Sequence, residues 1–587
     1  MNDWIWSFIF NRKEIIRDLI FFGCVIFACS APRFGERFFR AIETCGGRLA
    51  RRRVTAMVAI FAATIAIRLS ALWYIPVPFP AVQDEFAYLL QADTFVHGRL
   101  TNPTHPMWLY FDTFQVNQHP TYESKYPPGQ GAAVALGQVL GNPWIGVLLT
   151  GGLMCAAVLW MLQGWFPPGW ALLGGVTVML KIAAFSYWMN SYLGGFVAAI
   201  GGALVMGALP RILYGWKAAA LGAATEPLQS HVMWNAVALG VGVIVLANSR
   251  PFEGAFFCIP VFVVLLLRFF RGGAWRFGLR WVMAPLCVVG VLGGAFMGYY
   301  NWRGTGKATL MPYIVNERTY MNTPTFVWQK LQPPRHYQNP QFELFYNTMK
   351  RYRWAELGAT SLPKAARKLA YSLLVSMFFF LWPQLSLSLL ALGRLLRDRR
   401  MRMLVVQIVL IFAATLLARA WFSLHYIAPL TATIFTLATQ GLRYVRQWTA
   451  WGRPMGVAMT RVALLFVVLY APFNNTYHKT RFNNYESIEM RAEFSNQLGA
   501  MPGKHLVIVR YAPEDMGLRE WVYNGADIDG SKVVWAREIP GVSLQPLLNY
   551  FHGRQVWLAE PDAMTPRLSH YDVAASGATE TRANATP

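Results

Sequence analysis

Eleven runs of 17 to 23 residues with almost no charge divide this chain of 587 residues. A helix of about 20 apolar residues crosses the hydrocarbon core of a bilayer, where every backbone polar group must be satisfied within the chain. The sequence therefore predicts a polytopic α-helical membrane protein with about 11 transmembrane helices, within a range of 10 to 13. The runs are 54–76, 144–163, 169–188, 192–210, 232–248, 253–270, 281–300, 369–391, 403–420, 422–442 and 456–472.

The composition supports this class and explains the high charge. Hydrophobic residues make up 55% of the chain and charged residues only 14%, against about a quarter in soluble proteins. The net charge of +24 comes largely from arginine clusters between the runs. These clusters fall on alternate loops, as expected for the cytoplasmic side, so membrane orientation explains the charge better than nucleic-acid binding. They lie at 33–53, 268–280, 394–402 and 443–461.

This topology sets the expected domains. With the first arginine cluster inside, the run 54–76 leads outward, and residues 77–143 and 301–368 form two large outer loops. Residues 1–53 are expected to form an N-terminal amphipathic or membrane-associated segment with a cytoplasmic basic linker. Within them, residues 1–31 fit either an interfacial helix or a short extra span. Residues 54–472 form the transmembrane module.

The C-terminal part has the pattern of a small extracytoplasmic α/β domain over 473–562. Strand-like runs HLVIVRY, KVVWARE and RQVWLAE occur at 505–511, 532–538 and 554–560, with helical stretches near 485–498 and 543–552. Residues 563–587, which are rich in Ala, Thr and Ser, are expected to be disordered.

An acidic pair, Asp84-Glu85, opens the first outer loop just beyond the run 54–76. A carboxylate there can accept a proton from an attacking hydroxyl or amine, or bind a divalent cation. The same pair also suits the N-cap and first turn of a helix expected at 85–96. A second helix is expected at 129–140. The sequence leaves both interpretations of the pair open.

Other polar residues on the outer side could contact a substrate. Lys125 could neutralise a phosphate or anchor to headgroups, and Tyr126 could stack on a sugar or belong to the interfacial aromatic belt. For the other candidates a purely structural role is also open: a salt-bridged turn, aromatic residues at the membrane interface, or polar residues paired with each other. They are Arg250, Glu253, Tyr187, Asn190, His425 and Tyr426.

Two further features of the outer loops bear on ligands. His105 and His119 could join the acidic pair at a metal, but no spacing requires it, and no cofactor is otherwise indicated. The second outer loop is rich in Lys and Arg, including Lys350 and Arg353, and is either a solvated basic surface or a site of attraction for phosphate groups.

The arrangement resembles the GT-C superfamily of membrane glycosyltransferases, especially its protein O-mannosyltransferase and aminoarabinose-transferase branches. VQDEFAYLLQADTFVHGRL resembles the acidic opening of the family's first outer loop, and RAWFSLHYIAPL resembles a late element that closes its catalytic cavity. ESKYPPGQ resembles its Lys-Pro-Pro element, although Tyr126 separates Lys125 from Pro127. The resemblance covers roughly residues 54–440.

The resemblance implies a function. Asp84 would be the base or acceptor-binding carboxylate, Glu85 would assist it or bind a metal, and Lys125 would neutralise the donor phosphate. The protein would transfer a sugar from a polyprenyl-phosphate donor to a lipid, glycan or protein acceptor, outside a bacterial inner membrane. Alternatives are a transporter or flippase of lipid-linked glycans, a glycan ligase or polymerase, and a non-catalytic scaffold.

Overall fold

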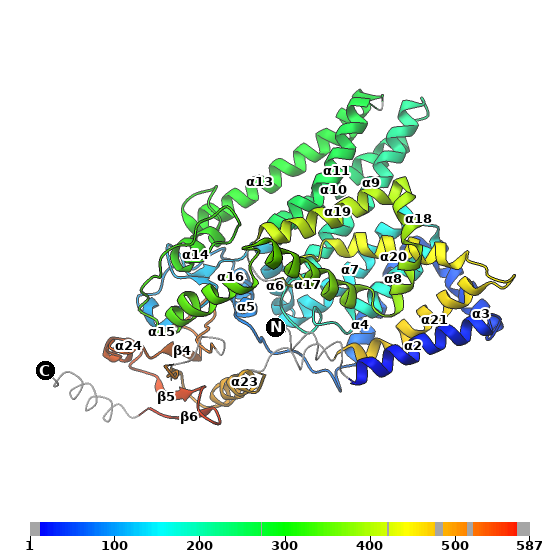
Figure 1. The fold of residues 1–587 in the computed structure, drawn as a ribbon. Helices are drawn as coiled ribbons and strands as arrows, with labels where there is room; N and C mark the ends of the chain where they lie inside the picture. Colours follow the sequence, from blue (N-terminus) through cyan, green and yellow to red (C-terminus); the bar gives the residue numbers. More distant parts are fainter. Residues whose placement is uncertain (1–11, 272, 419–421, 476–484, 514–519, 572–587) are drawn as a thin grey trace.

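The computed structural model describes residues 12–271, 273–418, 422–475, 485–513 and 520–571. Helices dominate it (Figure 1). Among the described residues, eight helices are long and apolar enough to cross a membrane, or nine if one bent pair counts as a span. The eight are α4 (Arg53–Ser70), α7 (Pro143–Trp165), α9 (Gly195–Ala220), α10 (Glu226–Ala247), α11 (Pro251–Arg271), the continuous helix Trp275–Thr305 that ends in α13 (Ala284–Thr305), α19 (Arg399–Leu417) and Met455–Phe473, which contains α21 (Met455–Tyr470).

Shorter helices lie where two further spans are expected, and of these the first, Pro168–Ala183, is apolar. These are α8 (Pro168–Val178), continued by a π-helical turn η2 (Met179–Ala183), and α20 (Leu430–Arg446). Both are shorter than the runs 169–188 and 422–442. The first ends at Ala183, and the second begins only after Pro429, whose fixed φ suits a helix start. The count of eleven spans stays a prediction.

The run 369–391 is not one straight helix, which corrects the expectation. α17 (Leu362–Phe380) is followed at a bend of 116° by the helical pair η5 (Gln384–Ala391) and α18 (Leu392–Arg397). Pro383 stands at the bend; it lacks a backbone N–H and disfavours helical geometry in the residue before it.

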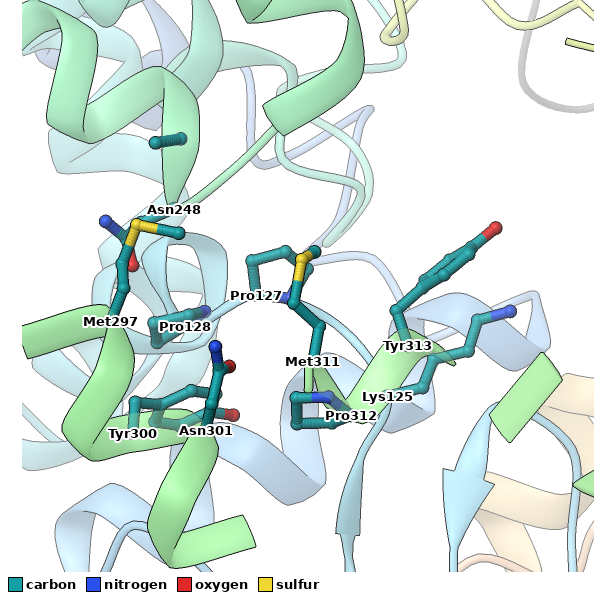
Figure 2. Close-up of a pocket in the computed structure, with 11 residues that line it drawn as sticks. Lys125, Pro127, Pro128, Asn248, Met297, Tyr300, Asn301, Met311, Pro312 and Tyr313 are labelled. Carbon is teal, nitrogen blue, oxygen red and sulfur yellow. The ribbon is translucent and has the colours of Figure 1, made fainter. Parts of the chain in front are cut away.

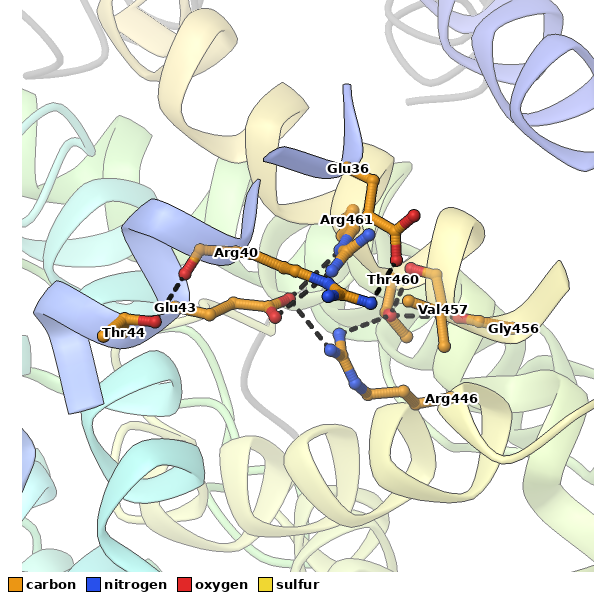
Figure 3. Close-up of polar contacts among 9 residues, drawn as sticks. All are labelled: Glu36, Arg40, Glu43, Thr44, Arg446, Gly456, Val457, Thr460 and Arg461. Atoms are coloured by element: carbon orange, nitrogen blue, oxygen red, sulfur yellow. Dashed lines mark hydrogen bonds and ion pairs between the residues drawn. The ribbon is translucent and has the colours of Figure 1, made fainter. Parts of the chain in front are cut away.

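Three of the arginine clusters meet at one end of the helical bundle. α3 (Glu36–Arg51) carries Glu43, whose carboxylate accepts from Arg446 at 2.8 Å and from Arg461 at 3.1 Å (Figure 3). The Tyr444 hydroxyl donates to Asp398 at 2.9 Å, which joins a third cluster. These contacts agree with the placement of the clusters on one side of the membrane. α2 (Arg12–Ser30), in the segment left open by the sequence, packs along α21.

Segments of the two outer loops gather at the other end of the bundle (Figure 1). In the first loop, α5 (Gln83–Val96) and α6 (Pro128–Val139) confirm both expected helices. Between them lie η1 (Trp108–Phe111) and a hairpin of β1 (Val116–Asn117) and β2 (Glu123–Ser124). The second loop forms α14 (Pro312–Tyr320), α15 (Pro340–Phe342), η4 (Glu343–Lys350) and α16 (Arg351–Leu357).

The C-terminal domain is a four-stranded sheet in the order β4-β3-β5-β6. β3 (His505–Val509) pairs in parallel with β4 (Val533–Arg537) and β5 (Gln555–Glu560), which confirms the three expected strands. α23 (Tyr485–Ala500) and α24 (Gln545–Tyr550) confirm the two helices.

β6 (Arg567–His570) corrects the expected disorder from residue 563. It pairs antiparallel to β5, and the His570 ring stacks on Trp557 with ring centroids 4.0 Å apart. Cross-strand contacts of this kind order a segment whose composition alone suggests disorder. Residues 572–587 lie outside the described residues.

Candidate functional site

Glu85 fastens the start of α5. Its carboxylate accepts hydrogen bonds from the backbone N–H groups of Ala81 at 2.6 Å, Val82 at 3.0 Å and Tyr192 at 2.8 Å. The side chain is 1% exposed. Burial raises the pKa of Glu85 to about 7, although the three donors oppose this shift. These contacts give Glu85 the first-turn role that the sequence left open, and they also tie α5 to the turn before α9.

Asp84 is half-buried and faces a different set of groups. The Tyr126 hydroxyl hydrogen-bonds to the Asp84 side chain, and the Tyr126 ring stacks on Tyr88 with centroids 4.6 Å apart. Tyr88 and Tyr126 are both buried. The loop between α5 and α6 therefore brings Tyr126 back to the acidic residue that opens it.

Lys125 lies within electrostatic range of the same carboxylate. Its ammonium is 4.7 Å from the ring centroid of Tyr313 in α14 and 5.3 Å from that of Tyr126. Burial lowers the pKa of Lys125, and the negative charges of Asp84 and Glu317 oppose the shift. A buried ammonium that is held mainly by aromatic faces keeps its capacity to bind an anion.

Arg250 enters from the turn between α10 and α11. Its guanidinium lies 4.8 Å from the ring centroid of Tyr426 and within electrostatic range of the Glu253 carboxylate and of the Tyr88 and Tyr126 hydroxyl groups. Tyr88 and Tyr126 also lie within electrostatic range of Asp84. The structure therefore brings together the predicted residues Asp84, Lys125, Tyr126, Arg250, Glu253 and Tyr426.

The second outer loop adds two cations that the sequence did not single out as site residues. Lys350, at the end of η4, is close enough to Lys125 and Arg353 to be repelled by them and to Asp84 to be attracted. Burial, followed by the charge of Lys125, lowers the pKa of Lys350 to about 8. The basic character of this loop is the only feature of the sequence that points to Lys350, because Lys350 and Lys125 are more than 200 residues apart in the chain.

The remaining candidates fall into other surroundings. Tyr187 and His425 contact each other, with 3.2 Å between the hydroxyl and Nδ1. Asn190 accepts from the buried Arg68 at 2.9 Å. His425 also contacts the ring of Tyr426, at 4.8 Å between centroids, so this buried cluster adjoins the Arg250 partner. Residues 419–421, which begin the motif RAWFSLHYIAPL, lie outside the described residues.

The two histidines considered as metal ligands contact residues other than the acidic pair. His105 Nε2 is 3.0 Å from Asp529 of the C-terminal domain, and His119 packs against the ring of Trp108. In the described part of the chain there is no group of three or more His, Cys, Asp or Glu side chains that could hold a metal ion.

A small cavity opens beside Lys125, between the ends of α6, α10, α13 and α14 (Figure 2). Lys125 and Tyr313 lie side by side at one part of its wall, while Met297 and Met311 supply apolar surface. Gly129 makes the wall compact: an added Cβ would lie 2.7 Å from the carbonyl oxygen of Asn248. The rest of the cavity is lined by Pro127, Pro128, Ala247, Asn248, Tyr300, Asn301 and Pro312.

The chain is similar to several solved membrane-protein structures, while no family model and no curated protein matches its sequence. ArnT from Cupriavidus metallidurans bound to undecaprenyl phosphate is 13% identical, with a TM-score of 0.44 over 86% of this chain and 92% of that chain. The Archaeoglobus fulgidus oligosaccharyltransferase tethered with an acceptor peptide is 11% identical, with a TM-score of 0.45 over 80% of this chain. This chain covers 63% of the archaeal protein.

Proposed function

We propose that this protein is a membrane glycosyltransferase of the GT-C type. It transfers one sugar from a polyprenyl-phosphate donor to an acceptor hydroxyl or amine on the extracytoplasmic face of a bacterial inner membrane. The observation that carries the proposal is that Lys125 and Lys350, from two separate segments, both interact with Asp84, while Arg250 approaches Tyr88 and Tyr126, the tyrosines that also interact with Asp84. The motifs around the first two agree with the family resemblance.

In this reaction Asp84 acts as the general base. The acceptor oxygen or nitrogen attacks the anomeric carbon and gives its proton to the Asp84 carboxylate. The bond from the anomeric carbon to the phosphate oxygen breaks, and its electron pair leaves with the polyprenyl phosphate. A single displacement of this kind inverts the anomeric configuration. Tyr126, which hydrogen-bonds to Asp84, orients the carboxylate.

The cations stabilise the leaving phosphate. Negative charge grows on the phosphate as the glycosidic bond breaks, and positive groups that are already fixed in place lower the energy of that state without reorganisation. Lys125 and Lys350 suit this role because they approach from different loops and repel each other. An anion placed between them would relieve both the repulsion and part of the cost of burial.

The mouth of the small cavity beside Lys125, which itself has room for about one water molecule, is where we place the junction between the phosphate and its lipid. Lys125 supplies charge, whereas Met297 and Ala247 supply apolar surface from the ends of α13 and α10. The neighbouring outer face of α13 exposes Phe296, at 45%, as expected of a helix that faces lipid. A donor lying here would keep its chain in the bilayer and its phosphate at the lysine.

The test is sugar transfer by the purified protein in lipid nanodiscs, with a panel of labelled undecaprenyl-phosphate pentoses and hexoses and a mixture of lipid and glycan acceptors. We expect Asp84→Asn to lower turnover by about 10² to 10⁴-fold, the usual contribution of a general base. The control is Glu343→Gln, a half-exposed carboxylate of the second outer loop. Full activity in Asp84→Asn would overturn the catalytic assignment. In sealed proteoliposomes, lipid-linked sugar that moves across the membrane without being transferred would favour a flippase.

A further inference from the structure

The C-terminal domain lies against the helix that carries Asp84. Residues 521–526, which we call the brace segment, are fixed to the edge of the sheet by Asn524. Its side-chain amide donates to the Trp535 carbonyl at 2.8 Å and accepts from the Trp535 N–H at 2.9 Å. The brace segment is therefore held by β4 and follows the position of the sheet.

The brace segment contacts α5 at two points. The Tyr523 ring lies parallel to Phe86, with 4.2 Å between centroids and 1° between planes. Further along, the Ala526 N–H donates to the Asp93 carboxylate at 2.6 Å. The two points are seven residues apart on α5, or about 10 Å at the rise of an α-helix. Gly525 permits the second contact, because an added Cβ would lie 2.7 Å from Asp93 Oδ2.

Arg491 of α23 completes the contact at the Asp84 end. Its guanidinium donates to the carbonyls of Trp521 at 2.8 Å and Tyr523 at 3.0 Å. It also lies 4.9 Å from the ring centroids of both Phe86 and Trp535. Its planar group therefore contacts the Phe86 ring while fixing the backbone of the residue that stacks on the same ring. A lysine cannot reproduce this arrangement, because an ammonium has neither the plane nor the fork.

We propose that the C-terminal domain positions Asp84 for catalysis, with Arg491 as the positioning residue. Phe86 is two residues from Asp84 on α5, so the contacts of Tyr523 and Arg491 on its ring set the height and rotation of the first turn. The inference rests on the proposed function in taking Asp84 as the base. It assigns the domain a share in the reaction, since a displacement of about 1 Å at a reacting group can cost about 10²-fold in rate.

The experiment compares full-length Arg491→Met and Arg491→Lys with Arg554→Met in nanodiscs. Arg554 is a matched control in the same domain: it donates to the carbonyls of Asp529 and Ser531, each at 2.7 Å, and lies 5.1 Å from the Phe551 ring centroid. Two kinds of measurement are made: steady-state transfer, which gives kcat and KM for a labelled undecaprenyl-phosphate sugar, and hydrogen exchange of the backbone amides of residues 85–93.

We expect both Arg491 variants to lower kcat by about 10²-fold with KM within about twofold of wild type, and to speed exchange in α5. Arg554→Met should change neither quantity. Equal effects of Arg491→Met and Arg554→Met, or full activity in Arg491→Lys, would overturn the proposal. If Arg491→Met fails to fold, Tyr523→Leu decides between the same outcomes.

The exchange measurement separates this proposal from the proposed function. If the wild-type protein transfers no sugar, the proposed function fails. Faster exchange of residues 85–93 in Arg491→Met, but not in Arg554→Met, would still support the brace. If the wild type is active and exchange in α5 is unchanged in the Arg491 variants, the brace fails and the function stands.

Discussion

The two ends of the molecule hold basic residues in opposite ways. At the end that carries the arginine clusters, the carboxylate of Glu43 pairs with both Arg446 and Arg461 (Figure 3), whose side chains are 28% and 8% exposed. At the other end, Lys125 is 9% exposed and lies near Lys350, a second cation that repels it. The paired charges at the first end serve orientation and folding, whereas Lys125 and Lys350 lie within electrostatic range of each other and of Asp84 and Glu317, and are the cations that the proposed function assigns to the donor phosphate.

The largest effect expected from this comparison is at Lys125. In the proposed reaction Lys125→Met removes a buried cation that stabilises the leaving phosphate, so turnover should fall by about 10²-fold or more, as when a fixed group that stabilises transition-state charge is lost. Steady-state transfer measures this loss. An equal loss of turnover in Arg446→Met, at the end that carries the arginine clusters, would contradict the claim that the two ends have different roles.

A smaller and pH-dependent effect is expected at Lys350. Its pKa is lowered to about 8, so the ammonium is charged below that pH and loses its proton as the pH rises through it. Affinity for undecaprenyl phosphate should therefore weaken by about tenfold between pH 7 and pH 9, in the range of one charge-assisted contact. Titration of the lipid into nanodiscs at each pH measures it, and Lys350→Met should bind weakly at every pH. A Lys350→Met protein that keeps the wild-type pH dependence would show that another group titrates.

The smallest effect is expected at the paired end. Glu43→Gln removes the shared carboxylate, and partly exposed ion pairs contribute about 1 kcal/mol or less. Thermal unfolding in detergent should shift by only a few degrees, and transfer activity should equal that of wild type. A loss of activity here would mean that the two ends are coupled.

Much of the fold follows from local sequence patterns. The helix that carries Asp84 and the strands at 505–511, 532–538 and 554–560 could be predicted because their periodicity and turn residues are local. The strand β6 could not, because it depends on pairing with β5. Pro383 is itself a local signal for a bend, but the apolar run continues on both sides of it, so hydropathy alone predicts a single span there.

The site divides in the same way. Asp84 and Lys125 belong to one loop and could be predicted together. Lys350 could not, because its position depends on long-range packing: Phe342 and Phe345, near the start of η4, pack on Phe114 of the first outer loop, at 4.7 Å and 4.6 Å between centroids. Such contacts between segments distant in sequence leave no local pattern.

The most direct test of the account is a double-mutant cycle on transfer, with Lys125→Met, Lys350→Met and the double variant. If both lysines act on one phosphate, the double variant should depart from the product of the single losses by a coupling of about 1 kcal/mol or more, roughly fivefold in rate. The cycle of Lys125→Met with Glu43→Gln is the control, and in it the fold losses in turnover of the two single variants should multiply. Losses at Lys125 and Lys350 that multiply within about twofold would contradict a shared phosphate, since independent sites add in free energy.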